Sequence, residues 1–131
     1  MKIRIVNQEL DDLDESKFNK KNLYHHAIKR QHLQEYRHDP RFPDFNTTGL
    51  SELMKKYNEI GDNLSNSPAS SPSSADRIVG FVDKNGRTVK YDRTYGDYIV
   101  FTGEDTITMF KKTEQQFQNC VKRDYAKDIE N

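Results

Sequence analysis

The histidines of this chain gather in one short stretch. All four, His25, His26, His32 and His38, lie within fourteen positions of each other, and Arg37 stands among them. Histidine titrates near neutral pH, so it can remove a proton from a hydroxyl group and return it. Beside arginines, such a histidine could activate a hydroxyl next to a phosphate. A solvated polar helix face is the other interpretation of the same stretch.

A metal site is a third interpretation, and the spacing does not favour it. Zinc-binding helices place two histidines four residues apart, so that both project from one face. No pair here has that spacing, since His25 and His32 are seven residues apart. The single cysteine, Cys120, rules out both a disulfide framework and a cysteine-based zinc site. We therefore predict neither a metal nor a cofactor.

A second set of residues, which could bind a phosphate, lies in the segment 77–111. The pattern of this segment predicts an antiparallel meander. Turn-forming clusters divide it, and Asn85-Gly86 is the strongest hairpin signal among them. The predicted strands are 78–82, 87–92, 97–101 and 106–111. Alternation of side chains places Val89, Ile107 and Met109 on the core face, and Lys90, Thr106 and Thr108 on the opposite face. A cation and two hydroxyls on one surface suit a phosphate, although an ordinary solvated sheet face would alternate in the same way.

The remaining elements are helices and loops that must position these groups. A helix is predicted from Ser16 to His38, and prolines then impose a loop over 39–45. Asn46, Thr47 or Thr48 would cap the next helix, whose apolar stripe runs from Leu50 to Leu64. Apolar residues spaced by four predict a last helix beginning at Thr113.

These elements define one α+β domain over 1–131, with N-terminal helices, a four-stranded antiparallel β-sheet and a C-terminal helix. Its parts are a helical segment 1–64, a flexible Ser/Pro-rich loop 65–75, a β-meander 76–112 and a C-terminal helix 113–131. The acidic block at residues 9–15 is either a solvated segment, or a lid or partner-docking segment.

Composition limits the function classes. The chain has 21 basic and 21 acidic residues, which argues against holding long nucleic acid by bulk positive charge. It has no apolar run long enough for a membrane span and no secretion signal, so we expect a cytoplasmic protein without a membrane partner. A DNA-binding regulator is disfavoured because no helix-turn-helix pattern is present.

The segment RIVGFVDKNGRTVKYD, followed by DYIVF and TITMFK, resembles the C-terminal half of the barnase–EndoU–colicin–RelE-like ribonucleases. This superfamily includes toxin domains and phage-encoded members. Its basic, histidine-rich helical stretch would correspond to KRQHLQEYRHDPRF. The chain departs from the pattern in two places: its Ser/Pro loop is longer, and Lys112 stands where the family usually carries a proline.

The resemblance implies a metal-independent endoribonuclease in which the ribose 2′-hydroxyl attacks the adjacent phosphate and gives a 2′,3′-cyclic phosphate. It implies RNA as substrate, with tRNA as one candidate, and a cognate immunity protein as a further partner. The residues for these roles are His32 or His38 as base or acid, Arg37 and Lys90 for charge, and Thr106 and Thr108 as hydroxyl donors. The alternative is a non-catalytic phage-type protein that binds and inhibits or regulates a host protein. A histidine close to the Lys90/Thr108 surface would favour the enzyme.

Overall fold

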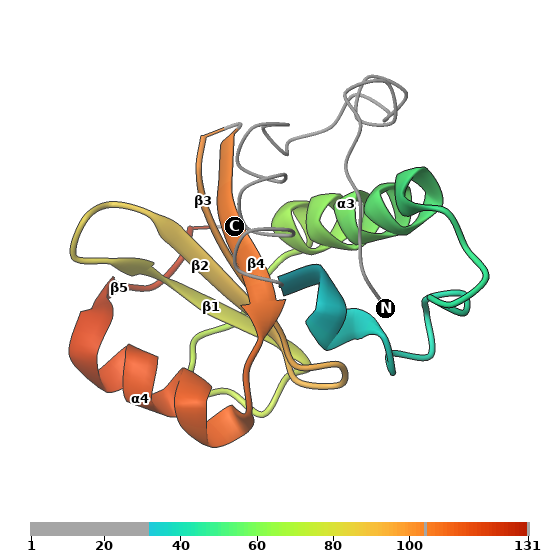
Figure 1. Cartoon of the computed structure of the whole chain (residues 1–131). Coiled ribbons are helices and arrows are strands. Elements are labelled where there is room, and N and C mark those ends of the chain that lie inside the picture. Colours follow the sequence, from blue (N-terminus) through green and yellow to red (C-terminus); the bar gives the residue numbers. More distant parts are fainter. Residues whose placement is uncertain (1–31, 104, 131) are drawn as a thin grey trace.

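The computed structural model describes residues 32–103 and 105–130, and Figure 1 shows their arrangement. The side chains of residues 105–107 lie outside this description. The elements are η2 (His32–Tyr36), α3 (Leu50–Asn66), β1 (Ile78–Asp83), β2 (Thr88–Asp92), β3 (Asp97–Thr102), β4 (Asp105–Lys111), α4 (Glu114–Asp124) and β5 (Tyr125–Lys127). The α+β class is confirmed. Within the described residues, no helix is long and apolar enough to cross a membrane.

The sheet is antiparallel throughout and has the strand order β4-β3-β2-β1-β5. The first four strands begin and end within two residues of the predicted positions. Asn85-Gly86 forms the hairpin between β1 and β2, where Gly86 has a φ of 79°. Asp83 organises this turn, because its Oδ1 accepts hydrogen bonds from the backbone N–H groups of Asn85 and Arg87.

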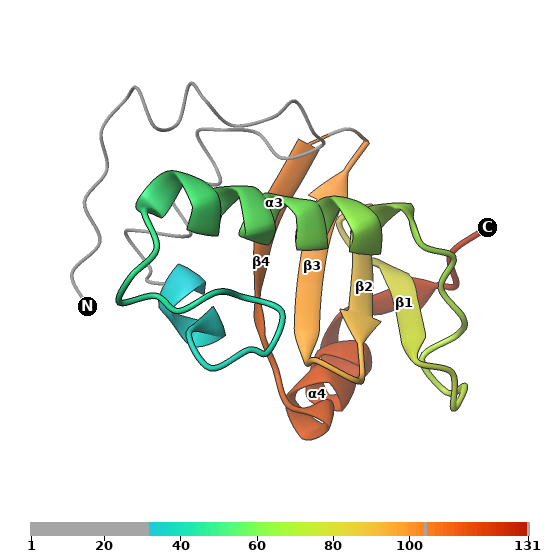
Figure 2. The ribbon, with the colours of Figure 1, turned by 90° about the vertical axis from the view of Figure 1, so that its right-hand side faces the viewer.

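A helix covers each face of the sheet: α3 lies across one face and α4 lies behind the other (Figure 2). The strand register gives each face a row of residues. We call the side that bears Gly80, Lys90, Ile99 and Met109 the α3 face. The side that bears Val79, Tyr91, Tyr98 and Phe110 is the α4 face.

Both faces are therefore lined by a core. The α3 face is packed by the buried residues Leu33, Tyr36, Phe45, Leu50, Leu53, Met54, Tyr57, Ile60, Leu64, Ile99, Phe101 and Met109. The α4 face is packed by Val79, Phe81, Val89, Tyr91, Tyr98, Val100, Phe117 and Cys120. A sheet that is covered on both sides has no polar solvent face, which explains why most of its side chains are apolar.

The predicted assignment of faces is wrong. Lys90 pairs with Ile99 and Ile99 with Met109, so Lys90 and Met109 share the α3 face. Thr108 is the neighbour of Met109 and pairs with Val100, which places it with Val89 on the α4 face. Alternation within one strand is visible in a sequence, but the register between strands is not.

The C-terminal helix is shorter than predicted, because α4 ends at Asp124. Its start is well defined: Thr113 and Gln116 form a capping box. Beyond Asp124 the chain becomes β5 and pairs with Val82 and Asp83 of β1. The unpaired edge of β1 offers backbone hydrogen bonds, which outweigh the continuing helical spacing of apolar residues.

The ends of α3 also differ slightly from prediction. Gly49, rather than Asn46, Thr47 or Thr48, is the N-cap residue, and the helix continues to Asn66. The helix predicted from Ser16 lies outside the described residues up to position 31. Its last part, His32–Tyr36, is a 3-10 helix.

The Ser/Pro-rich segment 65–75, whose composition predicts a flexible loop, is hydrogen-bonded to the sheet. Ser70 forms a parallel bridge with Val79 at the edge of β1. Arg93 donates to the carbonyl oxygens of Ser74 and Asp76, at 2.5 and 2.7 Å. The segment is therefore held against the edge of β1 and against Arg93 by hydrogen bonds.

The close approach of strands at Gly80 generates a stability prediction. A Cβ atom at this position would clash with the carbonyl oxygen of Val89 and lie 2.8 Å from Cδ1 of Ile129. We expect Gly80→Ala to lower the free energy of unfolding by at least about 2 kcal/mol, since the β1–β2 pairing must move. Gly49→Ala is the matched control: nothing lies within 4 Å of its Cβ position, so only the N-cap preference of glycine over alanine, about 1 kcal/mol, should be lost. Urea unfolding of both variants tests this, and equal stabilities would contradict it.

Candidate active site

The segment that carries His32 lies along the outer edge of β4, where Figure 1 shows η2 beside that strand. The backbone N–H of Lys111 donates to Oε1 of Glu35 at 2.9 Å, which ties η2 to the strand. The η2 residues Leu33 and Tyr36 are fully buried. The position of η2 is thus set by an apolar contact and by a hydrogen bond to the edge of the sheet.

A buried ion network holds the chain just after η2. Arg41 binds Asp39 through two nitrogens, at 3.0 and 2.7 Å, and Nη1 of Arg41 lies 2.8 Å from Asp97. Lys111 lies 2.6 Å from Asp39 and 3.3 Å from Asp97. Both carboxylate side chains are only 1% exposed. Burial alone would raise the pKa of Asp39, but hydrogen bonds from Arg41 and Lys111 outweigh it and hold the pKa well below the usual range.

The imidazole of His32 is fixed from two sides. Its Nδ1 lies 2.9 Å from Oε2 of Glu35. Its ring stacks on Phe110, with the centroids 4.8 Å apart and the planes at 16°. When neutral His32 donates through Nδ1 to the carboxylate, its basic lone pair resides on Nε2. A carboxylate that orients a histidine in this way is the usual support of a general base.

A cation lies at the same aromatic ring, and a hydroxyl side chain lies on the same face of β4. The Nζ atom of Lys112 lies 4.9 Å from the ring centroids of both Phe110 and Tyr98. Thr108 is two residues before Phe110 on β4 and therefore faces the same side of the sheet. We call His32, Glu35, Thr108, Phe110 and Lys112 the His32 cluster. It combines a proton acceptor, a positive charge and a hydroxyl, which are the groups that phosphoryl chemistry requires.

Two of the predicted site residues lie elsewhere. His38 and Arg37 are exposed and line a depression of about 300 Å³ together with Gln34, Asp44, Phe45 and Asn46. None of these residues belongs to the His32 cluster. The structure thus separates the two described histidines into different environments, and it gives only His32 a carboxylate partner within its own turn.

The predicted role of Lys90 on an exposed phosphate-binding surface is contradicted. Lys90 is 6% exposed, and its Nζ donates to the carbonyl oxygens of Ser65 and Ser67 at 2.9 and 2.5 Å. Its charge caps the C-terminal end of α3, where unpaired carbonyls attract cations. Thr106 pairs with Phe101 through its backbone, and its side chain lies outside the described part of the chain.

Sequence reasoning missed three members of the cluster: Glu35, Phe110 and Lys112. Glu35 could have been found, because a carboxylate three residues after a histidine lies on the same side of a helix. Lys112 stood out as the place where the chain departs from the family pattern. Phe110 carried no signal of its own, since an aromatic residue in a strand is most simply a core residue.

Comparison of the chain with models of known families, with curated proteins and with solved structures finds no match. The site must therefore be judged from its own geometry. Among residues 32–103 and 105–130, no group of three or more His, Cys, Asp or Glu side chains could hold a metal ion.

The ion network around Asp39 generates a prediction about acid stability. Because its pKa is lower in the folded than in the unfolded protein, Asp39 stabilises the fold above pH about 4 and loses this effect as the pH falls. We expect Asp39→Asn to cost about 3 kcal/mol at neutral pH, and the difference from the natural protein to shrink at acid pH.

Urea unfolding of both proteins at neutral and at acid pH measures this difference. Glu59→Gln is the control, because Glu59 forms an exposed ion pair with Lys56 and should cost less than about 1 kcal/mol. A difference for Asp39→Asn that stays constant with pH would contradict the assignment.

Proposed function

We propose that this protein is a metal-independent endoribonuclease whose active site is the His32 cluster. One observation carries the proposal: an imidazole oriented by Glu35 lies at the same aromatic ring as the ammonium group of Lys112. The resemblance of the β-meander to the barnase–EndoU–colicin–RelE-like ribonucleases points to the same chemistry. Thr108 and His32, which sequence analysis assigned to the site, both belong to this cluster.

The reaction follows from the roles that the side chains can take. Nε2 of His32 removes the proton from a ribose 2′-hydroxyl, and the resulting oxygen attacks the adjacent phosphorus. The bond from phosphorus to the 5′ oxygen breaks, and that oxygen takes a proton from water while the imidazolium releases its own to solvent. Lys112 and the Thr108 hydroxyl stabilise the charge on the crowded phosphorane. The products are a 2′,3′-cyclic phosphate and a 5′-hydroxyl.

The substrate class follows from the nucleophile. Only RNA carries the internal 2′-hydroxyl, so DNA cannot react by this route. The balanced charge of the chain favours a short contact with RNA at the cluster over a long electrostatic track. Exposed single-stranded loops, such as those of tRNA, present the 2′-hydroxyl and phosphate with the least obstruction.

The substrate prediction is tested with total tRNA in excess EDTA. We expect cleavage that leaves 2′,3′-cyclic phosphate ends, read as terminal phosphates that a phosphatase removes only after acid has opened the ring. The same RNA with a 2′-O-methyl group at the cleaved position should stay intact, because the nucleophile is blocked. Cleavage of the methylated RNA, or dependence on a divalent cation, would refute the mechanism.

The residue assignment is tested with matched histidine variants. His32→Ala should lower the cleavage rate by about 100- to 10,000-fold, the usual contribution of a general base. His38→Ala should leave the rate within about twofold, because His38 lies outside the cluster. Glu35→Gln and Lys112→Gln should each lower the rate by at least about tenfold. Equal effects of the two histidine variants would reject the cluster as the active site.

A non-catalytic binding protein is the second candidate function, and the position of Lys90 favours it. Lys90 is buried on the α3 face, whereas Thr108 lies on the α4 face, so the phosphate surface first expected from the strands does not form. A nuclease-like sheet without the chemistry could serve to inhibit or regulate another protein. Intact RNA in the cleavage assay, together with stable capture of a protein partner, would favour this function.

A further inference from the structure

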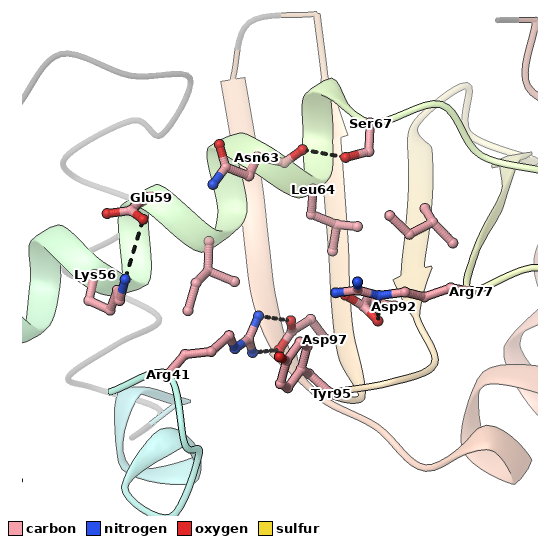
Figure 3. Close-up of a pocket in the computed structure, with 12 residues that line it drawn as sticks. Arg41, Lys56, Glu59, Asn63, Leu64, Ser67, Arg77, Asp92, Tyr95 and Asp97 are labelled. Atoms are coloured by element: carbon pink, nitrogen blue, oxygen red, sulfur yellow. Dashed lines mark hydrogen bonds and ion pairs between the residues drawn. The ribbon is translucent and has the colours of Figure 1, made fainter. Parts of the chain in front are cut away.

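A pocket of about 350 Å³ lies on the other side of the sheet from the His32 cluster. Figure 3 shows it between α3 and the residues near the ends of β2 and β3. Its volume lies in the range of small-molecule sites. The proposed nuclease chemistry makes no use of it.

The inner wall of the pocket is apolar. Ile60 and Leu64 of α3 are 7% and 5% exposed, and Ile78 of β1 is half-buried against the same core. Tyr95 borders this wall. The guanidinium of Arg41 stacks on its ring, with the guanidinium carbon 3.8 Å from the ring centroid, and that of Arg77 lies 5.3 Å away. Tyrosine rings and guanidinium planes are the groups on which nucleobases stack.

The basic side chains that line the pocket are more exposed than most of their acidic partners. The side chains of Arg77, Lys56 and Arg41 are 56%, 34% and 20% exposed. Their partners Asp92 and Asp97 are only 6% and 1% exposed. The acids are thus withdrawn beneath the arginines, and a ligand meets mainly the positive ends of these ion pairs. Glu59, on the rim beside Lys56, is the exposed acid among the lining residues.

The buried carboxylates also fix the cations. Arg77 binds Asp92 through Nε at 3.0 Å and through Nη2 at 2.8 Å, which sets the plane of the guanidinium. Nη1 takes no part in this bidentate pair. A guanidinium held in this way is pre-organised to donate to a phosphate, so little side-chain entropy is lost when the phosphate binds.

We propose that this pocket binds a nucleotide, with the base against the apolar wall and the stacked pair of Arg41 and Tyr95, and the phosphate at Arg77 and Lys56. Asn63 and Ser67 also line the pocket. Asn63 supplies an amide for the polar edge of the base, and the Ser67 hydroxyl, which donates to the Asn63 carbonyl oxygen at 2.7 Å, supplies an acceptor oxygen. Binding here is independent of RNA cleavage, because the pocket and the His32 cluster lie on opposite faces of the sheet. The same chemistry would accept a free nucleotide or one nucleotide of a strand.

The test is calorimetric titration with AMP, GMP, CMP and UMP, and separately with adenosine and with inorganic phosphate. We expect saturable binding of at least one monophosphate, tighter than that of adenosine or phosphate alone. Absence of saturable binding of all four at millimolar concentration would overturn the proposal. So would binding of inorganic phosphate as tight as that of the best nucleotide, since the base would then play no part.

The variant R77Q/D92N removes both charges of one ion pair and leaves no buried carboxylate without a partner. The amide that replaces the Asp92 carboxylate keeps an oxygen for the hydrogen bond that Asp92 accepts from the backbone N–H of Thr94. We expect this variant to bind the nucleotide at least about tenfold more weakly. The control R123Q/D124N makes the same chemical change in the exposed pair on α4 and should bind normally.

Equal weakening by both double variants would overturn the assignment of the pocket. Thermal unfolding of both checks that each is folded, and Lys56→Gln provides a second measure at the opposite wall. A trinucleotide that binds more tightly than the monophosphate would support the pocket and identify a strand as its ligand. If the natural protein binds a nucleotide but does not cleave RNA, the proposed nuclease function is rejected and the nucleotide pocket is supported.

Discussion

Two buried carboxylates constrain how the elements of this fold can be arranged. Asp39 comes from the loop after η2 and Asp97 from the start of β3, and both are shielded from water. A buried charge without a partner costs several kcal/mol, so Arg41 and Lys111 must reach both acids for the chain to fold as it does. Because Lys111 belongs to β4 and Arg41 to the loop, the network fixes η2 against the sheet. It adds to the contacts that position His32 and Glu35, and it holds Arg41 at the wall of the pocket beside α3.

The two covered faces of the sheet give the protein two separate chemical environments. On the α4 face, the Phe110 ring contacts both an imidazole and an ammonium group at the edge of the sheet. On the α3 face, ion pairs surround a pocket with an apolar wall. A sheet with one solvated face would have offered one broad surface, whereas this one confines polar chemistry to its margins. The proposed cleavage site and the proposed nucleotide site can therefore differ in ligand and in affinity.

Local sequence signals made the strands predictable. They made only part of the proposed active site predictable. Asn85-Gly86 and the alternating runs beside it located β1 and β2, because turn chemistry and side-chain period act within a few residues. The faces were not predictable, since Lys90 and Thr108 alternate identically whether one face or both are buried. The burial of Lys90 depends on where α3 ends, and the end of α4 depends on a free edge of β1. Of the proposed active site, His32 and Thr108 were found from residue type, and Glu35 could have been found from its spacing after His32. Phe110 joins the site only through the fold.

The contacts at the two edges of the sheet also affect whether copies of the protein can pair in concentrated solution. Exposed strand edges are templates on which other chains can pair and aggregate. Here Glu35 already occupies a backbone N–H of β4, and Ser70 and the three-residue β5 share the outer side of β1. β5 is short and bears an exposed lysine, so it provides few backbone groups with which a second copy could pair. These contacts thus occupy part of the outer edge of both β4 and β1.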